Sequence, residues 1–134
     1  MSDFNRAIID EFRANDGKVG GMFDGARLLL LHTTGARSGR EHVTPLVYEP
    51  VGDGMLIFGS KGGAPTHPDW YHNLTAHPDT TIEVGSDTVA VRARELEGDE
   101  YARLWQRQVE LMPGLGDYQA KTTRRIPLLV LDPR

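Results

Sequence analysis

The chain has 134 residues, of which 39% are hydrophobic and 25% are charged, so it can form one domain with a hydrophobic core. Its formal net charge of −4 argues against a protein that binds nucleic acid through a general basic surface. The chain has no cysteine, which excludes disulfides, thiolate catalysis, zinc–thiolate sites and iron–sulfur clusters.

The first predicted element is an amphipathic helix over residues 3–15. Its apolar positions recur at the spacing of one helix face: Phe4, Ile8, Ile9 and Phe12. We expect this face to cover the core. The polar face carries Asp10 and Glu11, so we expect at most weak contact with an anionic membrane surface. We expect neither a signal peptide nor a membrane-spanning helix, because no sufficiently long apolar run occurs.

Six short strands are predicted along the rest of the chain. The second and third flank Gly52-Asp53-Gly54, which is typical of a tight hairpin turn. The predicted elements are strands over 27–34, 43–51 and 55–60, a short helix over 69–76, strands over 79–85 and 88–96, a helix over 99–112, one or two helical turns within 118–125, and a strand over 126–131. Hairpin connections favour a largely antiparallel sheet, so we expect a mainly β (α+β) fold: a small barrel with helices over its ends.

A polar turn follows the first strand. Seven of its eight positions are Thr33, Thr34, Gly35, Arg37, Ser38, Gly39 and Arg40. Hydroxyl groups, flexible amides and two guanidinium groups at one point of a sheet suit an anionic phosphate group. The turn has neither the glycine–lysine pattern of a P-loop nor the G-x-G-x-x-G pattern of a dinucleotide-binding fold. A solvated hairpin loop without a ligand is the alternative interpretation.

A second candidate site is the loop after the third strand. Lys61 supplies a cation, while Gly62 and Gly63 allow the backbone to approach a flat ligand closely. Trp70 offers a flat surface beside this loop, or it pins the short helix to the core.

Three histidines near this loop do not form a convincing metal site. His67, His72 and His77 are five residues apart, a spacing that does not place them on one helix face. No acidic residue completes a ligand set, so we expect no metal.

A tyrosine and a lysine near the C-terminus form a candidate catalytic pair. Tyr118 and Lys121 are one helical turn apart, and such a pair can donate a hydrogen bond to a substrate oxygen. The alternative is a buried tyrosine beside a solvated lysine.

Taken together, these segments resemble a known family. The segments TTGARSGR, PLVY, GSKGGAPTHPDWYHNL, AHPD and YQAKTTRRIPLLVL are similar to those of the deazaflavin-dependent nitroreductases and quinone reductases. The resemblance covers about residues 25–131. It implies one domain over 1–134, with an N-terminal helix within 1–17 and a split β-barrel of the FMN-binding type over 26–134.

The resemblance also implies bound coenzyme F420, a 5-deazaflavin with a phosphate-bearing, oligoglutamate tail. The cofactor-binding positions that it implies are Thr34, Arg37, Ser38, Gly39, Arg40, Pro45, Ser60, Lys61, Gly62, Gly63, Ala64, Trp70 and Asn73. Tyr118 lies where the family places substrate-side tyrosines, with Lys121 beside it.

We therefore expect an F420H2-dependent oxidoreductase that transfers a hydride to a quinone, enone or nitroaromatic acceptor. An FMN-dependent reductase on the same barrel and a non-catalytic F420-binding or storage protein are the alternatives. We expect a monomer or homodimer without nucleic acid or metal. The expected location is the cytoplasm, including the inner membrane face.

Overall fold

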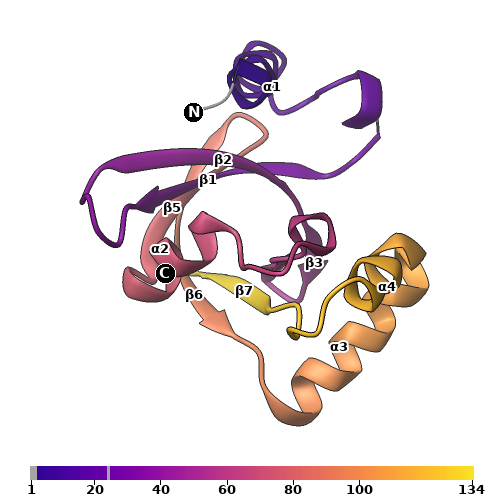
Figure 1. The fold of residues 1–134 in the computed structure, drawn as a ribbon. Helices are drawn as coiled ribbons and strands as arrows, with labels where there is room; N and C mark the ends of the chain where they lie inside the picture. The colour runs from indigo at the N-terminus through magenta and orange to yellow at the C-terminus, as the bar shows by residue number, and fades with distance from the viewer. Residues whose placement is uncertain (1–2, 24) are drawn as a thin grey trace.

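The computed structural model describes residues 3–23 and 25–134; residues 1 and 2 of the predicted N-terminal helical segment lie outside this part. Antiparallel strands curve around a common interior, and helices pack around them (Figure 1). The elements are α1 (Asp3–Ala14), η1 (Gly21–Phe23), β1 (Leu28–Thr34), β2 (Glu41–Val47), β3 (Glu49–Val51), β4 (Gly54–Phe58), η2 (Lys61–Gly63), α2 (Asp69–Ala76), β5 (Asp79–Val84), β6 (Asp87–Glu95), α3 (Gly98–Leu111), α4 (Pro113–Ala120) and β7 (Leu128–Pro133).

The sheet has seven strands, not the six expected, because the predicted strand 43–51 is two strands. The strand order is β2-β1-β5-β6-β7-β4-β3, so β2 and β3 form opposite edges. Only Tyr48 separates these two strands, and its amide donates to the Arg27 carbonyl at 3.0 Å. The segment therefore pairs first with β1 and then bends to pair with β4. This bend joins the two edges and gives a split barrel.

Strand β1 is buried on both of its faces. Leu29 and Leu31 pack in the main core, inside the barrel, whereas Leu28 and Leu30 pack against α1. Phe12 of α1 packs in the same cluster as Leu28 and Leu30, and only 1% of its surface is exposed. The N-terminal helix thus covers the outside of the barrel, as its apolar face predicts. Among the described residues, no helix is both long and apolar enough to span a membrane.

The C-terminal helices close another side of the barrel. Tyr101 and Leu104 of α3 pack against β4 and β7. Pro113 begins α4, because a residue in the first turn of a helix needs no amide donor. Helix α4 therefore spans 113–120 rather than lying within 118–125, and it ends two residues after Tyr118.

Candidate functional site

A cleft of about 1030 Å³ lies where the β1–β2 turn, the start of β2 and helix α2 meet. Asn5 of α1 also reaches it. The carboxylates of Glu41 and Asp69 line it as well. Its other polar side chains include Thr33, Arg37, Ser38, His42, Thr44, His72 and Asn73. Hydroxyl, amide, imidazole and guanidinium groups therefore line one concave surface.

Hydrogen bonds within the β1–β2 turn fix its shape. The Gly35 amide donates to the Arg40 carbonyl at 2.7 Å, and the Gly39 amide donates to the Gly35 carbonyl at 2.9 Å. Gly39 has φ 70°, which favours glycine at this position. The Ala36 amide donates to Asn73 Oδ1 at 3.0 Å, so Asn73 ties the turn to α2.

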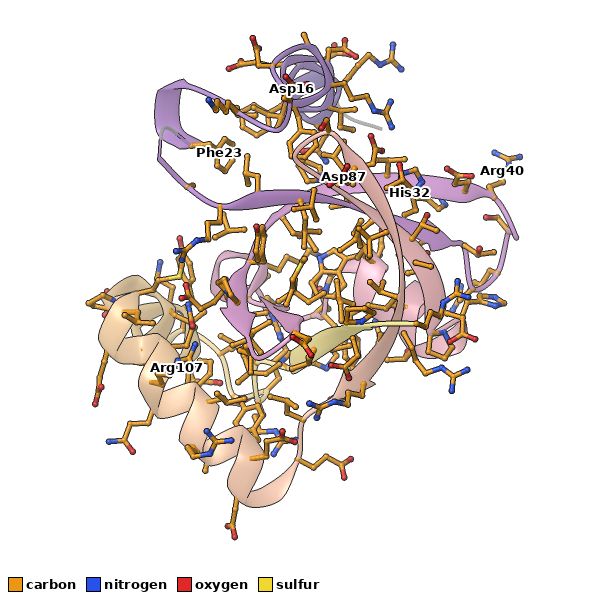
Figure 2. The ribbon with its side chains drawn as sticks, turned by 180° about the vertical axis from the view of Figure 1, so that it is seen from behind. Asp16, Phe23, His32, Arg40, Asp87 and Arg107 are labelled. Atoms are coloured by element: carbon orange, nitrogen blue, oxygen red, sulfur yellow. The ribbon has the colours of Figure 1, made fainter. Side chains whose placement is uncertain are left out.

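The two arginines of this turn lie differently. Both are exposed, but only Arg37 lines the cleft. Arg40 lies at the end of the turn, with its side chain directed away from the barrel (Figure 2). The positive charge at the cleft therefore comes from Arg37.

A buried hydroxyl group at the end of β1 lacks a partner. Thr33 is 2% exposed, it lines the cleft, and its Oγ1 has no hydrogen-bond partner within the described residues. An unpaired buried hydroxyl is costly, so such a group commonly signals a ligand or water. The next residue, Thr34, is exposed and does not line the cleft.

The loop after β4 has an unusual backbone. Lys61, Gly62 and Gly63 have φ values of 45°, 63° and 83° in succession. A Cβ on Gly63 would lie 2.8 Å from the Tyr118 carbonyl oxygen, so the loop approaches the end of α4 closely. At Gly62, by contrast, a side chain would meet only open space. The Lys61 ammonium donates to Thr66 Oγ1 at 3.2 Å.

Tyr118 and Lys121 lie beside this loop. The Tyr118 side chain is 38% exposed, and Lys121 Nζ lies 5.7 Å from the centre of its ring. The pair therefore presents a phenol and an ammonium group to the outside of α4.

Aromatic side chains pack behind the loop. The His67 and Tyr71 rings are 4.5 Å apart, and those of His67 and His72 are 5.9 Å apart. Burial and a hydrogen bond to Glu95 at 2.7 Å raise the pKa of Tyr71 to about 12. The close approach of two histidines was not expected; it arises because His67 precedes α2. Across residues 3–23 and 25–134, no cluster of three metal-binding side chains occurs.

The predicted cofactor-side residues fall into three groups. Arg37, Ser38, Trp70 and Asn73 line the cleft, whereas Thr34, Gly39, Arg40 and Pro45 do not. The segment 60–64 forms a separate surface beside α4. The sequence interpretation placed Thr33 in the polar turn but not among the cofactor-binding positions, and it did not expect His42, Thr44 or His72 at a cofactor cleft. His42 and Thr44 alternate along β2, a period-2 pattern that could have indicated them.

Comparisons with known proteins place this chain among deazaflavin-dependent enzymes. The family model described as F420H(2)-dependent quinone reductase matches residues 4–133. An F420H(2)-dependent quinone reductase of Mycobacterium tuberculosis is 43% identical over 127 residues, which cover 92% of this chain and 85% of that protein.

Two solved structures are also similar. An F420-H2 dependent reductase has a TM-score of 0.70 at 37% identity, covering 79% of this chain and 94% of that one. A structure described as a domain-swapped dimer has a TM-score of 0.71 at 37% identity, covering 79% of this chain and 80% of that one.

Proposed function

This chain belongs to the F420H(2)-dependent quinone reductase family, and we propose that its cleft binds the anionic tail of F420 while residues 60–64 contact the deazaflavin ring. It is an F420H2-dependent oxidoreductase with coenzyme F420 as its cofactor, and FMN remains only an alternative. The observation that carries the binding proposal is the cleft, where a guanidinium group and an unpartnered buried hydroxyl face the same space.

The cleft suits a phosphate-bearing group. Arg37 supplies a fixed charge and a planar fork of donors. Ser38 Oγ accepts the Arg40 amide at 3.2 Å, which leaves the hydroxyl hydrogen for a ligand oxygen. Glu41 also lines the cleft, but it is bonded to His32 Nδ1 at 2.8 Å. Thr33 Oγ1 supplies a second hydroxyl donor.

The loop and α4 supply the surface for the reaction. When bound and reduced, the deazaflavin provides the hydride. The open side of Gly62 allows a flat ring to lie against the backbone, and Lys61 places positive charge nearby. We assign Tyr118 to donate a hydrogen bond to the acceptor oxygen, where negative charge grows during reduction. The Lys121 ammonium beside the phenol ring favours the same charge.

A quinone-like small molecule is the proposed acceptor, and enone and nitroaromatic compounds share its electrophilic character. The domain-swapped neighbour supports a homodimer as one assembly of this chain. We propose a cytoplasmic location. Contact between α1 and the inner membrane face would be weak, since Asp10 and Glu11 lie on its exposed surface.

The direct test mixes the protein with F420H2 and a soluble quinone and follows the recovery of deazaflavin absorbance. We expect saturable turnover with F420H2 and none with reduced FMN at equal concentration. Tight F420 binding without turnover of any quinone, enone or nitroaromatic compound would instead identify a cofactor-binding or storage protein.

Replacing Tyr118 by phenylalanine tests the assigned donor. The Tyr118→Phe variant keeps the ring, so F420 affinity should stay within about twofold, while kcat should fall about 10- to 100-fold. Tyr71→Phe is the matched control, because its hydroxyl already donates to Glu95. Wild-type turnover by the Tyr118 variant would remove this phenol from the mechanism.

A further inference from the structure

One arginine from the segment before β7 holds the whole loop after β4. Arg124 Nε donates to the Ala64 carbonyl at 2.9 Å, and its two terminal nitrogens donate to the carbonyls of Gly59 and Ser60 at 3.0 and 2.9 Å. A fourth contact joins Nη1 to His67 Nδ1 at 3.1 Å. A single half-buried guanidinium group therefore binds the loop at four residues, from Gly59 at its start to His67 at its end.

The loop needs such a partner. Its three consecutive residues with positive φ begin with Lys61, a conformation that a side chain disfavours. The bonds inside the turn are few: the amides of Gly63 and Ala64 donate to the carbonyls of Ser60 and Lys61. The carbonyls of Gly59, Ser60 and Ala64 accept their bonds from Arg124, which comes from a distant part of the chain.

We propose that Arg124 is a positioning residue, which holds the loop over 59–67 in the shape that presents the backbone at Gly62 to the cofactor ring. This inference rests on the proposed contact between the loop and the deazaflavin. A preorganised loop binds more tightly, because the ordering cost is met before the ligand arrives.

His67 makes this arrangement sensitive to pH. A guanidinium group has no acceptor, so Nδ1 of His67 must be unprotonated to receive its hydrogen bond. Burial, then the charges of Arg124 and His72, lower the pKa of His67, and Glu95 opposes them. Protonation at Nδ1 would place two donors face to face. Because this pKa lies below the usual 6.5, His67 keeps its bond to Arg124 at neutral pH and loses it as the pH falls through the lowered pKa.

The test compares Arg124→Lys with Arg125→Lys, the same substitution one residue further along. Arg125 stacks on the Tyr101 ring at 4.2 Å, a contact that lysine can keep, so this control should behave as the wild type. In the ligand-free protein, amide hydrogen exchange over 59–67 should be about tenfold faster in Arg124→Lys. Its dissociation constant for F420 should rise about tenfold.

A second variant, His67→Asn, tests the proposal without removing the arginine, so its result does not depend on whether Arg124→Lys folds. His67→Asn keeps an acceptor near Arg124 but cannot be protonated, so its F420 affinity at neutral pH should match the wild type. The loss of affinity below pH 6.5 should be smaller than in the wild type. His42 and His72 are unchanged between the two proteins, so a difference between their pH profiles comes from position 67.

The outcomes separate this inference from the proposed function. Unchanged exchange over 59–67 in Arg124→Lys would overturn the positioning role, and so would faster exchange with unchanged F420 affinity. Identical pH profiles for the wild type and His67→Asn would overturn the part assigned to His67. Failure of the wild type to bind F420 would overturn the proposed function, whatever the exchange data show.

Discussion

The charge of the β1–β2 turn is divided between two arginines with different surroundings. Arg37 lines the cleft, whereas Arg40 does not. The Arg40 side chain points outward from the barrel (Figure 2). Charge-assisted bonds depend on short distances, while an exposed charge without a direct contact acts only through screened attraction. The two residues should therefore contribute unequally to binding an anionic tail.

Arginine-to-alanine substitutions test this difference. Arg37→Ala should weaken F420 binding by about 1–3 kcal/mol, the range of a lost charge-assisted hydrogen bond. Arg40→Ala should cost less than about 0.5 kcal/mol, and neither change should lower apo-protein stability by more than that amount. Isothermal titration and thermal unfolding measure both quantities. An equal loss of affinity in the two variants would contradict the arrangement described here.

Thr33 gives a prediction in which stability and affinity move in opposite directions. Thr33→Val keeps the side-chain shape and removes a buried hydroxyl that has no protein partner. The free energy of unfolding of the apo-protein should therefore stay the same or rise by about 1 kcal/mol. If the hydroxyl donates to the ligand, F420 affinity should fall about tenfold. Thr34→Val, at an exposed neighbour outside the cleft, is the control for affinity.

The sequence could identify which types of side chain form the site, but not in every case which of them face the cleft. Arg37, Ser38 and Asn73 were expected on the cofactor side, and they do line the cleft. Thr33 was part of the predicted polar turn, but Thr34 stood in its place among the cofactor-binding positions. The leucine run before them shows no alternation that could indicate which of the two threonines faces the cleft. That run carries no period-2 signal, since β1 has α1 on one side and the barrel interior on the other.

At the scale of the elements, an ion-pair network fixes α1 to the barrel. Arg13 donates twice to Glu83, at 3.0 and 2.7 Å, and Glu83 Oε2 lies 2.7 Å from His32 Nε2. The Gly85 turn also touches the end of this helix, where a Cβ on Gly17 would be 2.7 Å from Gly85 Cα. Figure 2 shows Asp87, at the start of β6, below the end of this helix that carries Asp16. Helix α1 is thus held at its C-terminal end.

Breaking the Arg13–Glu83 pair should give a pH-dependent loss of stability. The hydrogen bond from Arg13, opposed by burial and helped by His32, lowers the pKa of Glu83 below 4.5. A carboxyl group with a lowered pKa stabilises the fold above pH 4.5. This stabilisation is lost as the pH falls through the lowered pKa. Arg13→Gln should therefore cost about 0.5–1 kcal/mol at pH 7 and progressively less below 4.5.

Urea unfolding across this pH range measures the difference between wild type and variant. Arg6→Gln on the same helix is the control, because Arg6 forms no ion pair within the described part of the chain. A difference for Arg13→Gln that stays constant down to pH 3 would show that Glu83 is not the partner that matters.

Element positions were predictable where local signals were strong. The short helix over 69–76 was predicted with the observed bounds, since Pro68 precedes it and His77-Pro78 follows it. The division at Tyr48 was not predicted, because the run of Leu46, Val47 and Tyr48 favours one continuous strand. Glu49 and Pro50, which are uncommon in strands, were the local signal of a break. Only the pairing with two different strands, β1 and then β4, requires the bend, and this pairing is a property of the whole split barrel.

At the scale of the whole molecule, α2 connects the two surfaces assigned to the cofactor. It begins shortly after the 59–67 loop, and its Asn73 holds the β1–β2 turn. A helix of 8 residues is about 12 Å long, so a ligand that contacts both surfaces must be extended. F420 has a long anionic tail beyond its ring system, whereas FMN ends at a single phosphate.

This arrangement predicts cofactor choice through ligand-induced stabilisation. A ligand at 100 times its dissociation constant stabilises the native state by about 2.7 kcal/mol, so thermal unfolding reports affinity directly. At equal concentration, F420 should raise the melting temperature more than FMN does, because only F420 can contact both the cleft and the loop. Added salt should reduce the F420 effect, since Arg37 is exposed and its attraction to the tail is screened. The Arg37→Ala variant should lose most of this salt dependence, while Arg40→Ala should retain it. An equal or larger shift with FMN would show that the ring site, and not the extended anionic tail, determines which cofactor this barrel binds.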